Sequence, residues 1–164
     1  MDAFLSEWQT LLALQGGAAV TLTGLVFVAV SLNLSRIMNF PGLPGRAGES
    51  LLQLLQVFFI STAALIPRQP LTVLGIEVLL IVSLSWMAQT VGQIRYAKSR
   101  ADHPWSWLMT RVVFTQLATV PFWIAGIDLL LGGFSAVYWI VPGFVFSFTA
   151  AVISAWVLLI EILR

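Results

Sequence analysis

The stretch from Leu71 to Tyr96 constrains the fold most. It is longer than the ~20 apolar residues that a helix needs to cross a bilayer. It also carries polar residues at helical spacing. At about 100° per residue, one side is an apolar stripe: Leu80, Leu84, Met87, Val91 and Ile94. Another side is a polar arc: Glu77, Ser85, Gln89, Gly92 and Gln93. A membrane-spanning helix needs other helices to cover such an arc. The stretch therefore predicts one helix of a bundle.

The composition agrees with a membrane protein and excludes several other classes. The chain is 59% hydrophobic and only 9% charged, whereas soluble domains are roughly 25% charged. A net charge of +1 argues against a nucleic-acid partner. The absence of cysteine excludes disulfides, thiol catalysis and cysteine-based metal sites.

Four further apolar stretches accompany the first. We predict an all-α, polytopic membrane protein, a five-transmembrane-helix bundle that forms a single domain over residues 1–164. The expected spans are 8–38, 47–66, 71–96, 105–131 and 137–163. Pro-Gly steps at 41–42 and 44–45 should keep the chain in turns between the first two spans.

The basic residues predict the orientation. Five spans put the termini on opposite sides, and seven basic residues fall on or near one side: Arg36, Arg46, Arg95, Lys98, Arg100, Arg111 and Arg164. Only Arg68 falls on the other side. By the positive-inside rule, we expect the N-terminus outside and the C-terminus in the cytoplasm.

Two spans carry small residues at intervals that let helices approach closely. The first set lies in the first span: Ala13, Gly17, Thr21, Gly24 and Ser31. The second lies in the fifth span: Gly143, Ser147, Ala151 and Ala155. We expect the first set to pack within the chain, with a dimer seam as the alternative, and the second to contact another helix.

A belt of polar residues is predicted at one depth in the cytoplasmic half, counting ~1.5 Å per helical residue. Its members are Gln53, Gln56, Gln89, Gln93, Arg111 and Gln116. Unpaired amides are costly in hydrocarbon, so these side chains should face the bundle interior. Two interpretations are open, a hydrogen-bond network that fixes helix register and a water-filled inner vestibule. Arg111 either extends to the membrane surface or pairs with Glu49.

A second candidate site is predicted in the outer half from Glu77, Asp128 and Arg68. Two acids and one arginine can form a structural ion pair, a cation-binding site or a proton site. Asp128 is expected to be hydrated at the interface. If Glu77 is structural, we expect its partner to be Arg68, a Trp N–H or a hydroxyl.

The segment Gly24-Leu25-Val26-Phe27-Val28-Ala29-Val30-Ser31-Leu32-Asn33-Leu34, followed by Pro41-Gly42-Leu43-Pro44-Gly45-Arg46-Ala47, resembles the opening of small uncharacterised bacterial integral membrane proteins. The resemblance covers roughly the first third of the chain. It implies a location in the bacterial inner membrane, and it identifies no functional residue.

These observations favour a protein that is not an enzyme. The single histidine, His103, lies in a basic loop where a solvated role is expected, zinc-protease signatures are missing, and no cofactor or metal site is indicated. We expect a non-enzymatic inner-membrane protein that acts through helix packing with itself or a membrane partner in the lipid bilayer. The alternative is a channel or transporter for a small cation or protons, with Glu77 and Asp128 at its outer entrance.

Overall fold

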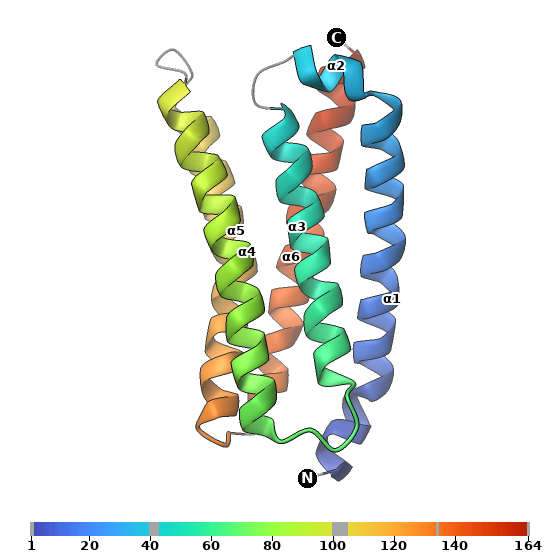
Figure 1. The fold of residues 1–164 in the computed structure, drawn as a ribbon, viewed down its shortest axis with the longest axis vertical. Helices are drawn as coiled ribbons and strands as arrows, with labels where there is room; N and C mark the ends of the chain where they lie inside the picture. The colour runs from blue at the N-terminus through green and yellow to red at the C-terminus, as the bar shows by residue number, and fades with distance from the viewer. Residues whose placement is uncertain (1, 40–42, 100–104, 134, 164) are drawn as a thin grey trace.

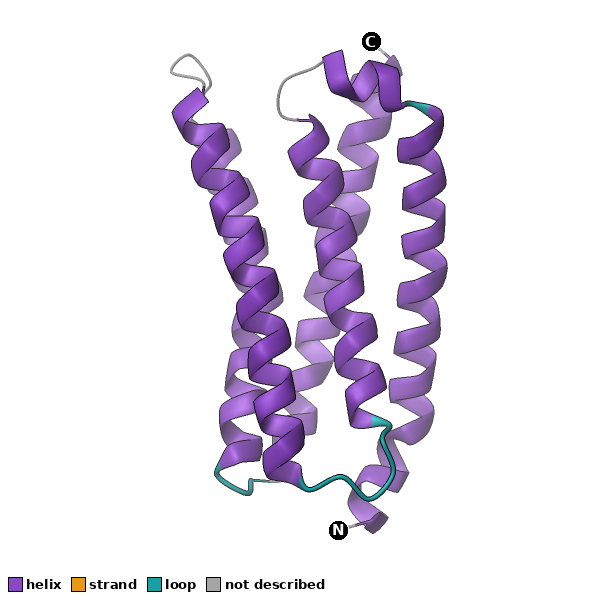
Figure 2. Ribbon diagram, viewed as in Figure 1, coloured by secondary structure: helices purple, strands orange, loops and turns teal. Residues whose placement is uncertain are grey.

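The computed structural model describes residues 2–39, 43–99, 105–133 and 135–163. All of its regular structure is helical in these ranges (Figure 2). The six helices are α1 (Asp2–Leu32), α2 (Leu34–Asn39), α3 (Leu43–Ala64), α4 (Leu71–Ser99), α5 (Trp105–Leu130) and α6 (Ala136–Leu163). Every helix except α2 is long and apolar enough to cross a membrane, so the prediction of an all-α bundle with five spans is confirmed.

The five long helices run side by side along the long axis of the molecule (Figure 1). α4 and α5 pack together on one side, α1 lies on the opposite side, and α3 lies between them in front of α6. The two termini lie at opposite ends. We call the end that carries α2 and the C-terminus the α2 end. The other end, which carries the α3–α4 connection, is the loop end.

The most buried span is α3, not the α4 stretch that dominates the sequence pattern. In α3, 61% of the apolar window is buried, compared with 33% in α4 and 17% in α1. α3 is also the least apolar of the five, and it carries Glu49, Gln53 and Gln56. Polar side chains need protein partners inside a membrane, which explains why the other helices surround this one.

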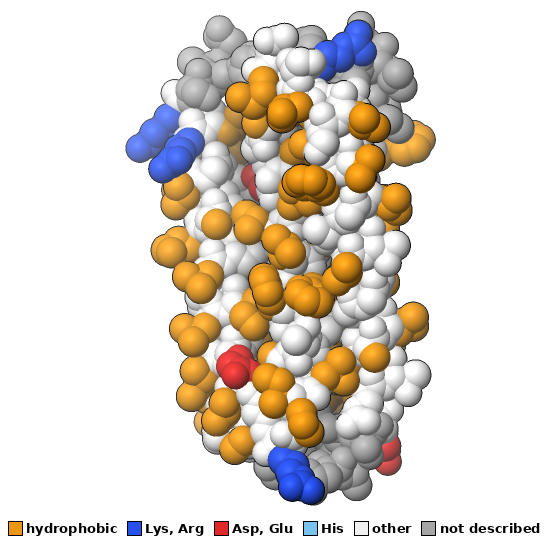
Figure 3. Space-filling view, turned by 45° about the vertical axis from the view of Figure 1, so that its right-hand side comes forward, with side chains coloured by type: hydrophobic (Ala, Val, Ile, Leu, Met, Phe, Trp, Pro, Cys, Tyr) orange, Lys and Arg blue, Asp and Glu red, His pale blue; other side chains and the backbone are white. Residues whose placement is uncertain are grey.

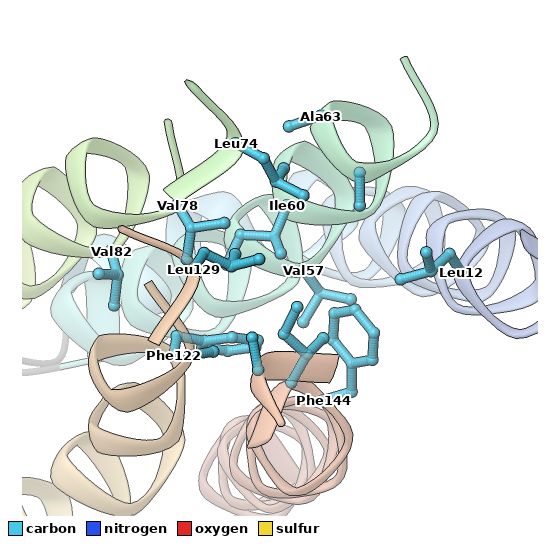
Figure 4. Close-up of a cluster of buried hydrophobic side chains, with 14 of the residues drawn as sticks. Leu12, Val57, Ile60, Ala63, Leu74, Val78, Val82, Phe122, Leu129 and Phe144 are labelled. Atoms are coloured by element: carbon cyan, nitrogen blue, oxygen red, sulfur yellow. The ribbon is translucent and has the colours of Figure 1, made fainter. Parts of the chain in front are cut away.

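The apolar core fills the loop-end part of the bundle. Each long helix contributes to one cluster of buried side chains, among them Leu12 of α1, Ile60 of α3, Val78 of α4, Phe122 of α5 and Phe144 of α6 (Figure 4). The rings of Phe122 and Phe144 meet edge to face, with their centroids 5.6 Å apart. The outer surface between the two ends is covered with hydrophobic side chains, and the basic side chains visible in Figure 3 lie toward the ends.

The first predicted span is interrupted before its expected end at residue 38. α1 stops at Leu32, Asn33 forms a turn, and α2 runs across the end of the bundle (Figure 1). The Asn33 amide nitrogen donates to the Ala29 carbonyl at 2.9 Å, and its backbone N–H donates to Val30 at 3.2 Å. Ile37 is then buried against the beginning of α3. The short-range bond to Val30 tightens the last turn and ends the helix.

The second span begins earlier than residue 47, because Pro44 and Gly45 belong to the first turn of α3 and not to a loop. Proline is tolerated there, since an N–H in the first helical turn has no partner within the helix. Residues 40–42, 100–104, 134 and 164, which include the predicted positions of Arg100, His103 and Arg164, lie outside the described residues.

Three glycines that the sequence patterns did not single out also bring helices close together. A Cβ on Gly75 of α4 would lie 3.0 Å from the Gly126 carbonyl oxygen of α5, and one on Gly126 would lie 2.7 Å from the Leu79 side chain. A Cβ on Gly16 of α1 would lie 3.2 Å from the Cβ of Ser61 in α3. These crossings fix the α4–α5 and α1–α3 contacts.

The two predicted small-residue stripes have opposite outcomes. In the α6 stripe, Gly143, Ser147 and Ala151 are buried within the chain and Ala155 is half-buried. Gly143 lies against the Phe122 ring and Ala151 is in a cluster with Val26 and Leu54, so this stripe contacts other helices as predicted. The α1 stripe is exposed from Ala13 to Ser31, and a Cβ placed on Gly17 or Gly24 would meet no other helix within 4 Å in the described parts of the chain. The expectation that this stripe packs within the chain is therefore wrong.

Candidate functional site

The polar belt lies inside the bundle. Gln53, Gln56, Gln89, Gln93 and Arg111 are buried, and Gln116 is half-buried. On the other face of α4, the apolar stripe from Leu80 to Ile94 is exposed. Both orientations agree with the helical periodicity of the sequence. The structure thus confirms the interior position of five of the six belt side chains, all but Gln116.

A buried ion pair joins α3 and α5 at this level. The Arg111 Nε donates to Glu49 Oε2 at 3.1 Å, and Nη2 donates to Oε1 at 2.6 Å. The guanidinium carbon of Arg111 also lies 4.9 Å from the centroid of the Tyr96 ring of α4, within the range of a cation–π contact. Of the two roles considered for Arg111, the structure has the pair with Glu49. The two parallel bonds fix the angle of the arginine as well as its position.

The amides connect neighbouring helices in two short chains. Gln53 of α3 donates to Gln89 of α4 at 3.3 Å, and Gln89 donates in turn to the Ser85 hydroxyl at 3.0 Å. Gln93 of α4 donates to the Thr115 hydroxyl of α5 at 2.8 Å. Together with the ion pair, these bonds tie α3, α4 and α5 into one register.

Several belt atoms remain without a hydrogen-bond partner in the described parts of the chain. They are both amide atoms of Gln56, Oε1 of Gln53 and Nη1 of Arg111. Unpaired buried groups of this kind are uncommon and are places where a protein holds internal water. The belt is therefore partly a closed network and partly an unsatisfied one.

A polar cavity of about 250 Å³ opens beside the ion pair, between α3, α5 and α6. The polar groups in its wall are those of Arg46, Glu49, Gln53, Thr110, Arg111, Thr115 and Ser154, and Phe114, Ala150 and Ile153 supply the apolar part. We call this space the polar cavity. Hydroxyls, an amide and an ion pair give it both donors and acceptors for water, although most of the surface exposed inside it is apolar.

The three residues of the outer candidate site do not form a cluster. Glu77 Oε2 accepts a hydrogen bond from Gln69 Nε2 at 2.6 Å, and Asp128 Oδ2 accepts one from the Ser135 hydroxyl at 2.8 Å. Arg68 is exposed in the α3–α4 connection. No hydrogen bond or ion pair joins any two of the three in the described ranges. The partner of Glu77 is thus Gln69, and not Arg68, a tryptophan N–H or a hydroxyl.

Sequence reasoning missed Gln69, Ser85, Thr115 and Tyr96 as partners of the named groups. Two of them carry a signal that was available. Ser85 precedes Gln89 by one helical turn, and that spacing brings side chains together. Thr115 follows Arg111 by one helical turn on α5, so the two side chains lie on the same side of that helix. Gln69 lies in a connection, where helical periodicity gives no orientation.

The described residues hold no group of three or more His, Cys, Asp or Glu side chains placed to bind a metal ion. No protein-family model, curated protein or solved structure matches the chain. The class that the fold supports is a helical membrane protein with five spans.

Proposed function

We propose that this is a non-enzymatic, multi-pass protein of the bacterial inner membrane that acts by packing its α1 stripe against a helix of a second copy or of a membrane partner. The observation that carries the proposal is the exposure of that stripe. Ala13, Gly17, Thr21 and Gly24 lie at spacings of three and four residues on the side of α1 that faces away from α3. Small residues at such spacings let two helix backbones approach closely in a membrane.

The polar atoms of the stripe support the same proposal. The Thr21 hydroxyl donates to the Gly17 carbonyl at 2.9 Å, and the Ser31 hydroxyl donates to Phe27 at 2.8 Å. Both hydroxyls are thus satisfied within α1. The face is smooth and has no unpaired donor that would oppose burial against another helix.

The bundle itself gives an enzyme or a pore less support. Buried polar side chains gather toward the α2 end, whereas the apolar cluster containing Val78, Phe122 and Phe144 fills the core at the other. A protein that works through association needs a rigid bundle, and the interhelical bonds of the belt supply that rigidity. The proposed orientation, with the α2 end in the cytoplasm, follows from the positive-inside rule.

Self-association is tested by fluorescence energy transfer between two labelled populations in liposomes. Gly17→Leu and Gly24→Leu should each reduce the transfer, because a large side chain separates the backbones. Ala88→Leu is the matched control, since Ala88 is an exposed small residue on α4. If wild-type protein shows no transfer at any density, the second copy is excluded, and photo-cross-linking from position 24 in native membranes tests for a membrane partner.

The alternative function, a channel or transporter for cations or protons, is supported by the polar cavity and the unpaired belt atoms. It would require the apolar core cluster to open. Flux assays on proteoliposomes test it directly: no flux of monovalent cations, Ca²⁺ or protons above that of empty liposomes would exclude permeation.

A further inference from the structure

A second hollow, which we call the α1–α6 groove, runs between α1 and α6 and has a volume of about 340 Å³. Its floor is formed by Val26, Leu54 and Ala151, which are buried. Different residues of α6 line the groove and the polar cavity, so the two spaces lie on different sides of that helix.

The chemistry of the groove is that of a hydrocarbon site. Asn33 is the only residue of its lining outside the hydrophobic class, and the Asn33 amide nitrogen is already bonded to the Ala29 carbonyl. Such a lining offers water too few partners to hold it. The groove lies along the membrane-spanning parts of α1 and α6, so it faces the lipid chains of the membrane.

The dimensions indicate one occupant. The α1 side of the groove runs from Leu22 to Asn33, which is ~17 Å at 1.5 Å per residue. That length is close to one leaflet, about half of the ~30 Å hydrocarbon core. An extended hydrocarbon chain from the surrounding lipid matches this length and the apolar lining of the groove.

The charge at the end of the groove indicates the kind of lipid. The groove ends at Asn33 and Ile37, where α2 crosses the bundle and carries Arg36. Basic residues near a membrane surface attract anionic headgroups. We propose that the α1–α6 groove binds one acyl chain of an anionic phospholipid from the leaflet at the α2 end.

Native mass spectrometry of the full-length protein tests this proposal, using micelles that contain equal amounts of phosphatidylglycerol and phosphatidylethanolamine. Wild-type protein should retain one phospholipid per protomer, enriched in phosphatidylglycerol. Ala29→Phe and Ala155→Phe fill the groove from opposite walls, and each should weaken retention about tenfold, the equivalent of ~1.4 kcal/mol. Ala88→Phe, on the exposed face of α4, should retain lipid as the wild type does.

Two results would overturn the proposal. The first is that Ala29→Phe and Ala155→Phe retain as much lipid as Ala88→Phe, while melting temperatures show that all three variants are folded. The other is an efficient disulfide-linked dimer of Ala155→Cys, in a chain with no other cysteine, because it would place a second copy in the groove.

Arg36→Gln tests the headgroup: it should remove the preference for phosphatidylglycerol, and an unchanged preference would contradict an anionic ligand. At 100° per residue, the α1 stripe lies on the opposite side of α1, so groove variants should leave self-association unchanged.

Discussion

Arg111 of α5 holds Glu49 of α3 through two parallel hydrogen bonds of 3.1 and 2.6 Å, with both side chains buried inside membrane-spanning helices. The pair neutralises a charge that neither helix could carry alone. Its arginine also contacts the Tyr96 ring of α4, so one side chain links three helices. The ion pair therefore connects α3, α4 and α5 within the polar belt.

Removing one partner of this pair should destabilise the bundle strongly, because the remaining charge stays buried. We expect Glu49→Gln or Arg111→Gln to lower the free energy of unfolding by about 3–5 kcal/mol, measured by denaturant titration in detergent. The double variant should lose less than the sum of the two single losses, since it leaves no bare charge. Arg95→Gln, at an exposed position of α4, is the control. Additive losses would show that the two charges do not interact.

The crossing of α4 and α5 at Gly75 and Gly126 gives a second prediction. There is no room for a side chain at either position, so Gly126→Leu should force the helices apart and cost about 1–3 kcal/mol. Gly92→Leu on α4 is the matched control, because a Cβ placed on Gly92 would have no atom within 4 Å. The melting temperature in detergent is the readout, and equal melting temperatures for the two variants would contradict the close crossing.

The periodicity of the sequence was sufficient to orient α4, because an arc of amides and a stripe of large aliphatics occupy different sides of one helix. The same reasoning placed Gln53 and Arg111 inside. It works because unpaired polar groups are expensive in hydrocarbon, so burial follows polarity.

The periodicity of the sequence did not predict the orientation of α1, because more than one side of that helix is compatible with lipid. In α1, Gly16 and Gly17 are adjacent, and only Gly16 approaches α3. Small residues can pack within a chain or against another one, and the pattern of Gly17, Thr21 and Gly24 does not distinguish these cases. The buried Leu12, Ala19 and Val26 decided the orientation through their contacts with other helices.

The α6 stripe supplies a prediction about an unsatisfied hydroxyl. Ser147 is fully buried, and its Oγ has no hydrogen-bond partner among the residues that the structure describes. Ser147→Ala should therefore keep or raise the stability, by up to about 1 kcal/mol, whereas Ser147→Leu should overfill the contact and cost about 1–3 kcal/mol. Ser50→Ala is the control, since the Ser50 hydroxyl donates to the Ala47 carbonyl at 2.9 Å and its loss should be unfavourable. A strong loss in Ser147→Ala would indicate a bond to internal water.

The backbone of Arg68 gives a prediction outside the bundle core. Its φ of 58° is in the left-handed region, which costs a residue with a side chain roughly 1–2 kcal/mol. Arg68→Gly should raise the free energy of unfolding by about 1 kcal/mol, because glycine adopts this conformation readily. Arg68→Ala removes the charge and keeps the Cβ, so it should give no such gain. If alanine and glycine gave the same change, the effect would come from the charge.

The last prediction concerns Glu77, where association and permeation lead to different results. Its carboxylate is half-buried on α4 beside the exposed Val73, Ile76 and Leu80, and it accepts a 2.6 Å hydrogen bond from Gln69. A structural role requires that bond. Glu77→Gln keeps an acceptor oxygen and should leave the stability nearly unchanged, whereas Gln69→Ala removes the donor and should cost about 1–3 kcal/mol.

Adding Glu77→Ala to Gln69→Ala should then cost little more, since the two side chains act as a pair. Proteoliposomes provide the second readout, with the wild type measured first. If wild-type protein carries a cation or proton flux and Glu77→Gln abolishes it without changing the melting temperature, the carboxylate charge is functional and the association proposal is incomplete. We expect no flux from either protein, together with a loss of stability in Gln69→Ala. That combination would assign Glu77 to anchoring the α3–α4 connection on the first turns of α4.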